Sequence, residues 1–173
     1  MLKLIQTLIN LGKVLLRSRF SLSLEESEDD RVIVLGNGPS LKNDILNHKE
    51  IFANSHLSVV NHFCHSEFFF ELEPKSYFLL DPAFFNDTHT NKNVEEQVGK
   101  TMDILINQVN WEIHLYVPYR NRNARNLRIL KEHKNFKIHY INYVPAKGGF
   151  RRINQWLYDR DLATPQCQNI LVF

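Results

Sequence analysis

The chain has 173 residues and a formal net charge of +2, from 21 Lys and Arg against 19 Asp and Glu. Its length fits a single domain, and 43% hydrophobic with 23% charged residues excludes a disordered or collagen-like chain. The near-neutral balance gives no electrostatic footprint for nucleic acid, and Cys64 and Cys167 are too few for a disulfide scaffold. We therefore expect a cytoplasmic globular protein that does not bind nucleic acid.

Residues 1–24 are predicted to form a separate basic amphipathic helix. Apolar residues recur at helical spacing through residues 1–20, among four basic and no acidic side chains. Polar residues interrupt this segment too often for a transmembrane span. Two interpretations stay open: the helix lies on an anionic surface, peripheral to the inner membrane, or it packs on its own domain or a partner. Residues 25–30, with five acids in six positions, are predicted to be a solvated linker.

Residues 31–173 are predicted to alternate strands and helices in one domain. Short β-branched or aromatic runs predict strands at 32–35, 57–60, 77–80, 113–117 and 138–143. Helical spacing of Leu, Ile and Val predicts helices at 41–52, 94–109 and 123–133. The alternation predicts a Rossmann-like α/β fold with a mostly parallel sheet, flanking helices and right-handed crossovers. A glycine pair within residues 147–152 favours a surface turn over a phosphate-contacting loop.

The turn after the first predicted strand is the main candidate for a ligand site. Its sequence, Gly36-Asn37-Gly38-Pro39-Ser40, joins that strand to a helix at the strand end where parallel sheets bind ligands. Two glycines permit backbone amides to approach a phosphate closely, and the following helix would offer free N–H groups to an anion. The turn lacks the third glycine of the dinucleotide fingerprint and the Lys-Ser/Thr pair of a P-loop. A plain tight turn would use similar residues, so both interpretations stay open.

Polar residues also follow the second and third predicted strands. Asn61 and Asp81 stand where these strands would open onto the same crevice, and they are candidates for hydrogen bonds to a ribose or base. Asn and Asp are also common turn residues at strand ends. No metal site is predicted at His62, Cys64 and His65, because alternation places His65 on the side opposite to the other two and the sequence offers no partner cluster.

Residues 31–85 resemble the opening of the bacterial CMP-sialic acid sialyltransferases, the family 42 glycosyltransferases. The resemblance rests on three segments in the order and spacing of that family: Val32 to Lys42, Val59 to Phe63 and Phe78 to Phe85. A wider superfamily of flagellin-modifying motility accessory factors and hydroxymethylpterin pyrophosphokinase-like proteins shares the opening. The resemblance implies a domain that binds a CMP-activated sugar for cell-surface polysaccharide or lipopolysaccharide synthesis. Its partners would be the nucleotide-activated sugar and a glycan acceptor, with no metal or other cofactor.

The resemblance implies a nucleotide-binding role for the turn. It places Asn37 beside the phosphate and ribose of a cytidine nucleotide. Gly36 and Gly38 would shape this loop, which runs on through Pro39 and Ser40.

Four further positions follow from the same resemblance. Asn61 would contact the nucleotide or the transferred sugar. Asp81 stands where the sialyltransferases usually have Asn, and a carboxylate there would repel an anionic donor sugar. Arg160 and Thr164 lie near the family's donor-site Arg and Thr-Ser pair, a match that Pro165 interrupts.

The carboxyl end departs from the resembled families, which continue through a lid that carries the general-base histidine. None of the eight histidines maps onto that base, and the chain ends on the apolar run Ile170–Phe173. We therefore expect the amino-terminal part of a longer glycosyltransferase-like protein, or a truncated copy, with its catalytic residues unknown. Two other classes stay open: a pterin pyrophosphokinase-type phosphotransferase that uses ATP and Mg²⁺, and a non-catalytic nucleotide-binding module. The oligomeric state stays open too.

Overall fold

The computed structural model describes residues 1–22 and 31–165, which form two compact units. Unit 1 contains residues 1–22, 118–122 and 140–165, and unit 2 contains residues 31–117 and 123–139. The division differs from the expected one, because residues 1–22 share a unit with residues 140–165 and do not stand apart from a 31–173 domain. The acidic segment 25–30 and the run Ile170–Phe173 lie outside the described residues.

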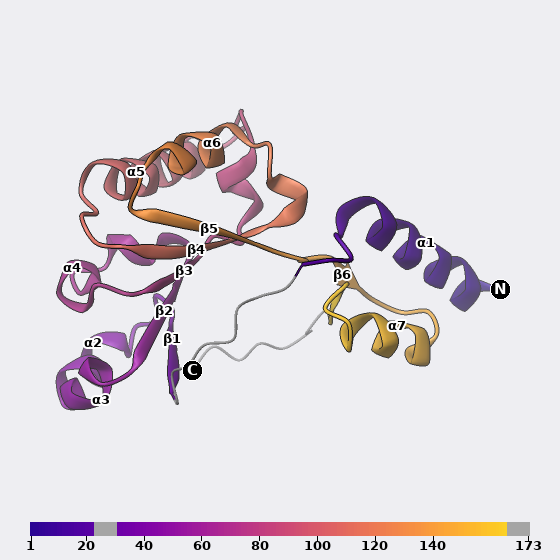
Figure 1. Cartoon of the computed structure of the whole chain (residues 1–173), viewed down its shortest axis with the longest axis horizontal. Helices are drawn as coiled ribbons and strands as arrows, with labels where there is room; N and C mark the ends of the chain where they lie inside the picture. Colours follow the sequence, from indigo (N-terminus) through magenta and orange to yellow (C-terminus); the bar gives the residue numbers. More distant parts are fainter. Residues whose placement is uncertain (23–30, 166–173) are drawn as a thin grey trace. The chain divides into compact units, whose positions relative to one another are not determined.

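A five-stranded parallel sheet confirms the predicted α/β, Rossmann-like fold (Figure 1). Its strand order is β1-β2-β3-β4-β5, and most of the sheet belongs to unit 2. The strands are β1 (Val32–Leu35), β2 (His56–Val60), β3 (Ser76–Phe78), β4 (Ile113–Pro118) and β5 (Phe136–Ile141). All five runs that were predicted as strands form strands, and no strand end differs from its predicted position by more than two residues.

The helices of unit 2 connect consecutive strands. They are α2 (Leu41–Asn47), α3 (Lys49–Ala53), α4 (Phe69–Leu72), α5 (Lys92–Asn107) and α6 (Arg125–Glu132). Short 3₁₀ turns follow β2, β3 and β4: η1 (Asn61–His65), η2 (Pro82–Phe85) and η3 (Tyr119–Asn121). Because each strand lies beside the next one in sequence, right-handed crossovers bring these connections to the same face of the sheet. Figure 1 shows α2 to α6 on one side of the strands.

The core of unit 2 lies between the sheet and these helices. One row of paired residues crosses four strands, and its members are at most 5% exposed: Leu35, Val59, Tyr77 and Leu115. The Tyr77 ring lies 6.0 Å from that of Phe69 in α4, so this row faces the helices. Since successive residues of a strand point to opposite faces, the adjacent row, which begins at Val34, faces away from them. Val34 is 65% exposed.

Unit 1 joins the amino-terminal helix to the last described elements of the chain. It contains α1 (Leu2–Arg17), α7 (Arg151–Tyr158) and the short paired strands β6 (Pro145–Ala146) and β7 (Thr164–Pro165). A small apolar core holds them together: Val14, Val144, Ala146, Leu157, Leu162 and Ala163. One side of α1 therefore packs on its own chain, as one of the two interpretations expected. None of the described helices has the length and apolar character needed to cross a membrane.

Candidate functional site

The turn after β1 and the end of η1 meet at one cavity of unit 2. The cavity has a volume of about 340 Å³ and lies at the carboxyl ends of the strands. One wall comes from the turn and the start of α2: Asn37, Gly38, Pro39, Leu41 and Lys42. The other wall comes from the segment after β2: His65, Ser66, Glu67 and Phe68. At the rim, Lys42 Nζ and Glu67 Oε1 form an exposed ion pair of 2.9 Å. The structure thus brings the predicted phosphate turn beside an imidazole.

Gly38 is a glycine that the described fold does not require. Its φ lies outside the left-handed region, and a Cβ added to it would meet no described atom within 4 Å. The turn ends in α2, which has only seven residues, and the Leu41 N–H donates to the Gly38 carbonyl over 3.2 Å. Ser40 makes no side-chain cap. The helix start therefore offers fewer free amides than the sequence suggested, whereas the space beside Gly38 is open.

Asn61 has a structural role at the end of β2. It adopts a left-handed φ of 48°, and its Oδ1 accepts hydrogen bonds from the Leu80 N–H over 2.9 Å and the Asp81 N–H over 3.1 Å. Its carbonyl accepts the hydroxyl proton of Tyr77. Asn61 thus ties the end of β2 to the end of β3, which is the turn interpretation of this residue. These contacts leave its Nδ2 as the group that could reach a ligand.

Asp81 also serves the local backbone. Its Oδ1 accepts a hydrogen bond of 2.8 Å from the Ala83 N–H and so caps the start of η2. The carboxylate also lies close enough to His62 to counteract, in part, the lowering of the pKa of that imidazole by burial. Asn61 and Asp81 thus both form hydrogen bonds with the backbone of the strand-end turns.

Two imidazoles share one buried hydroxyl beside these turns. His62 Nδ1 lies 2.8 Å and His65 Nε2 lies 3.0 Å from Thr101 Oγ1, in α5. The Thr101 hydroxyl has a single proton, which it donates to the Gln97 carbonyl over 3.0 Å. With the proton so placed, both imidazoles donate to Thr101, His62 through Nδ1–H and His65 through Nε2–H. In this arrangement the neutral His62 has a bare, unprotonated Nε2 and the neutral His65 a bare, unprotonated Nδ1. Thr101 was not expected from the sequence, because a Thr inside a predicted helix carries no signal of its own.

The structure favours the neutral form of both imidazoles. Burial is the main cause that lowers the pKa of His62, and Asp81 opposes it. Burial also lowers the pKa of His65, with help from the nearby charges of Lys100 and His62, while a hydrogen bond with Gln97 opposes it. A neutral imidazole with a bare nitrogen can accept a proton, so this pair can act as a base near neutral pH.

We expect mild acid to destabilise the protein through His62 and His65. Both have pKa values below the ordinary 6.5 in the folded state, so below that pH the unfolded chain binds more protons and stability falls as the pH drops. Carboxylates titrate lower, so melting curves between pH about 7.5 and about 5.5 isolate the histidines. Between these two pH values, the melting temperature of the double variant His62→Gln/His65→Gln should fall less than that of the wild type. The melting temperature of His48→Gln, at an exposed position, should fall as much as that of the wild type. Equal losses in all three proteins would contradict the expectation.

Arg160 and Thr164 belong to unit 1 and not to the strand-end site of unit 2. The Arg160 guanidinium lies over the Trp156 ring at 4.5 Å. The Thr164 N–H donates to the Val144 carbonyl over 2.9 Å where β6 pairs with β7. Their described contacts are those of a local structure in unit 1.

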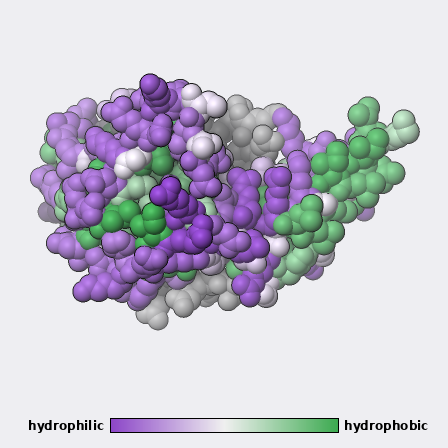
Figure 2. Space-filling view, turned by 90° about the horizontal axis from the view of Figure 1, so that it is seen from above, coloured by the Kyte–Doolittle hydropathy of each residue, from purple (hydrophilic) through white to green (hydrophobic). Residues whose placement is uncertain are grey.

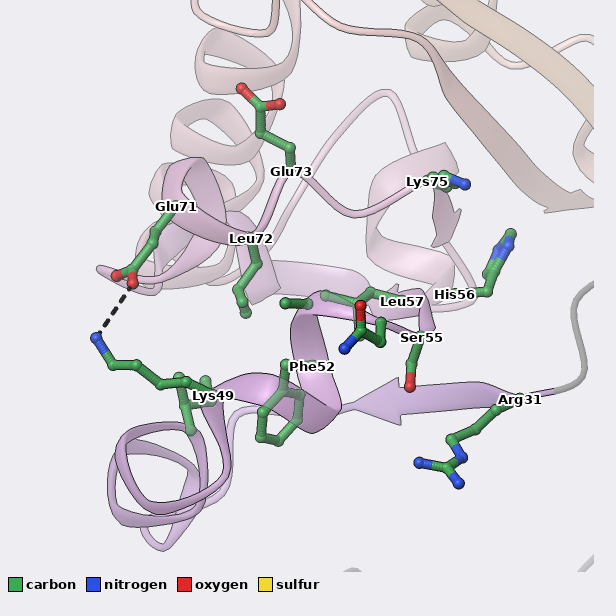
Figure 3. A pocket seen from close by; sticks show the side chains of 13 residues that line it. Arg31, Lys49, Phe52, Ser55, His56, Leu57, Glu71, Leu72, Glu73 and Lys75 are labelled. Carbon is green, nitrogen blue, oxygen red and sulfur yellow. Dashed lines mark ion pairs between the residues drawn. The ribbon is translucent and has the colours of Figure 1, made fainter.

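A larger cavity of about 930 Å³ lies at the opposite end of the strands (Figure 3). Arg31 and His56 line it where β1 and β2 begin, and Lys75 lines it just before β3. Lys49 Nζ and Glu71 Oε1 approach each other to 3.7 Å at one side of it. Ligands of open parallel sheets bind at the carboxyl ends of the strands, so we assign the candidate site to the smaller cavity.

Comparison with known proteins adds no assignment. No protein-family model, no curated protein and no solved structure matches the chain. Within residues 1–22 and 31–165, no group of three or more His, Cys, Asp or Glu side chains is placed to hold a metal ion. Cys64, between the two imidazoles in sequence, is buried, and burial raises the pKa of its thiol.

Proposed function

We propose that unit 2 binds a CMP-activated sugar in the cavity between the Gly36–Ser40 turn and His65. On this proposal the chain is a glycosyltransferase, or part of one, for cell-surface polysaccharide or lipopolysaccharide synthesis. Two observations support it. Residues 31–85 resemble the sialyltransferases, and Asn37, Gly38 and Pro39, from the turn that is most characteristic of this resemblance, line a cavity at the strand ends. The donor and acceptor are substrates, and no cofactor is invoked.

The openness of Gly38 is the observation that carries the proposal. The chain bears a glycine at a position where neither the backbone angle nor a described neighbour excludes a side chain. A glycine in such a place is explained when a ligand approaches the backbone closely. Its position on the cavity wall, beside Asn37, fits a nucleotide phosphate that rests against the turn.

The proposed reaction is direct displacement at the anomeric carbon of the donor. The acceptor hydroxyl loses its proton to a base, its oxygen forms a bond to the anomeric carbon, and the bond to the phosphate oxygen breaks as CMP leaves. His65 is the imidazole that lines the cavity, and we propose its bare Nδ1 as the proton acceptor. This role is independent of the family's own base, onto which no histidine of this chain maps.

Substitution of Gly38 tests the binding site. We expect calorimetry to show that CMP binds more tightly than GDP, or than ADP in the presence of Mg²⁺. Gly38→Ala should weaken CMP binding by about tenfold or more, which is about 1.4 kcal/mol, because its methyl group would occupy the space of the phosphate. The melting temperature should not fall, since no described atom lies within 4 Å of the new Cβ.

Gly99→Ala is the matched control for this experiment. Gly99 also has open space around its Cβ position, and it lies in α5 away from the cavity wall. This variant should bind CMP like the wild type. Equal or absent binding of the three nucleotides would remove the proposal, and a preference for ADP with Mg²⁺ would point to the phosphotransferase class.

Release of CMP from CMP-activated sugars tests the chemistry separately. If the chain catalyses transfer, His65→Gln should lower the acceptor-dependent rate by about 10²-fold or more while CMP still binds. His48→Gln, at an exposed position between α2 and α3, should keep the wild-type rate. CMP binding without release in the wild type would favour a binding module.

A further inference from the structure

The helix α1 directs its apolar side to the surface of unit 1. Seven large side chains of this helix are 46–87% exposed: Leu2, Leu4, Ile5, Leu8, Ile9, Leu15 and Leu16. Their spacings of four and seven residues place them on one side of the helix. Figure 2 shows the resulting gathering of hydrophobic residues at the right of the view, where Figure 1 places the amino terminus. An ordinary surface helix has the reverse arrangement, with its apolar side buried.

Polar contacts fix the opposite side of α1 against the rest of unit 1. Asn10 is 1% exposed, and its Nδ2 donates to the Lys147 carbonyl over 3.2 Å and to Asn154 Oδ1 over 3.3 Å. Thr7 Oγ1 accepts the N–H of Phe150 over 2.9 Å. Ser18 Oγ, just after the helix, donates to the Leu162 carbonyl over 2.7 Å. Rotation of α1 about its axis would leave these buried groups unpaired, so the apolar side is held outward.

Unit 1 is strongly basic, although the whole chain is nearly neutral. Its described residues include ten Lys and Arg but only two acids, Asp159 and Asp161, whereas those of unit 2 include eleven basic and twelve acidic residues. Lys13 borders the apolar side of α1, because it follows Ile9 by four residues, and Arg17 follows Lys13 by four. The apolar surface is thus accompanied by positive charge.

We propose that α1 docks unit 1 on the surface of a bilayer that contains anionic phospholipids. The leucine and isoleucine side chains would enter the boundary between headgroups and acyl chains, and the Lys and Arg side chains would reach the lipid phosphates. A second copy of the chain fits this surface less well, since a dimer through α1 would bring two basic helices together. Electrostatic attraction to an anionic surface acts in the favourable direction. The proposal does not depend on the nucleotide site.

Sedimentation of the full chain with vesicles tests this proposal. We expect binding to equimolar phosphatidylcholine and phosphatidylglycerol that weakens as salt is added, and little binding to phosphatidylcholine alone. Leu8→Glu/Leu15→Glu should abolish binding, and Lys13→Glu/Arg17→Glu should weaken it at least tenfold. The matched control Leu46→Glu/Ile51→Glu changes two exposed apolar residues of unit 2 and should bind like the wild type.

Three outcomes would overturn the membrane proposal. The first is no binding to anionic vesicles, and the second is equal binding to both vesicle types. The third is a dimer, measured by light scattering, that does not bind vesicles and dissociates when Leu8 is replaced by Glu. Hydrogen exchange measured on peptides of α1 and α7 checks that unit 1 is folded in each variant. We expect it to be folded, because all the substituted α1 side chains lie outside its buried core.

Discussion

Replacement of Asn61 by Ala should destabilise the protein by about 3 kcal/mol in urea unfolding. Two backbone donors, the N–H groups of Leu80 and Asp81, would lose their shared acceptor at Asn61 Oδ1. A buried donor left unpaired costs about 1–3 kcal/mol. Alanine would also have to adopt the φ of 48°, which costs about 1–2 kcal/mol for a residue with a Cβ. The turn interpretation from the sequence therefore predicts a large loss of stability at a position where the ligand interpretation predicts almost none.

Two further variants at this position separate the backbone strain from the lost hydrogen bonds. Asn61→Asp keeps an acceptor oxygen and a residue type that tolerates a positive φ, so it should be the most stable of the three variants. Asn61→Gly removes the strain but not the unpaired donors, so its stability should lie between those of Asp and Ala. An alanine variant that unfolds at the same urea concentration as the wild type would contradict the structural role.

The aspartate variant also tests whether Asn61 contacts a ligand. Replacement of Asn by an ionised Asp changes one group, since a carboxylate oxygen takes the place of Nδ2. The hydrogen bonds from Leu80 and Asp81 use Oδ1, so Nδ2 is available for a ligand. If CMP binding is lost in Asn61→Asp while stability is kept, the residue serves both the turn and the ligand. If binding is kept, Asn61 serves the turn alone.

The sheet could be predicted from the sequence because buried parallel strands consist of short runs of apolar residues. The limits of β1 were predicted at Val32 and Leu35 and are found there. The helix predicted over 41–52 is two helices, because His48 adopts φ −133° and ψ 33° and interrupts the hydrogen-bonded turns. Helical spacing continues through such a break, since the apolar residues on both sides of it still face the same core.

The candidate site could be predicted only in part, because some of its residues are recognised by local residue types and others depend on tertiary contacts. The turn at Gly38 and the strand-end position of Asn61 follow from local residue types. Whether Asn61 binds a ligand or the neighbouring turn depends on where β3 ends, and this is a tertiary contact. The same holds for Thr101, which reaches His62 and His65 only because α5 packs on η1.

The division into two units could not be read from the sequence either. Residues 1–22 pack with residues 140–165, more than a hundred positions away, and no local pattern reports such a distance. The amphipathic pattern of α1 indicated that its apolar side contacts a membrane surface, the rest of the chain or a partner. It did not show that polar Asn10 and Thr7 form the side that faces the protein.

Substitution of Gly149 should disrupt the attachment of α1 to unit 1. Gly149 has a φ of +77°, and a Cβ placed on it would lie 2.5 Å from Thr7 Oγ1, 3.1 Å from Thr7 N and 3.2 Å from Thr7 Cα. Two of these atoms belong to the helix backbone and cannot move aside alone. The clash would also break the hydrogen bond from Phe150 N–H to Thr7 Oγ1. Strain and lost contacts together should cost more than about 3 kcal/mol, a large part of the stability of a small unit.

Hydrogen exchange measured on peptides is the suitable test, because it follows each unit separately. In Gly149→Ala the amides of α1 should lose protection while those of α5, in unit 2, keep theirs. Gly12→Ala is the matched control, since Gly12 lies inside α1 with no described atom within 4 Å of its Cβ position. Alanine is favoured over glycine inside a helix by roughly 0.5–1 kcal/mol, so this control should raise the protection of α1. Unchanged protection of α1 in Gly149→Ala would mean that the close approach of the 148–149 turn to Thr7 does not hold the helix in place.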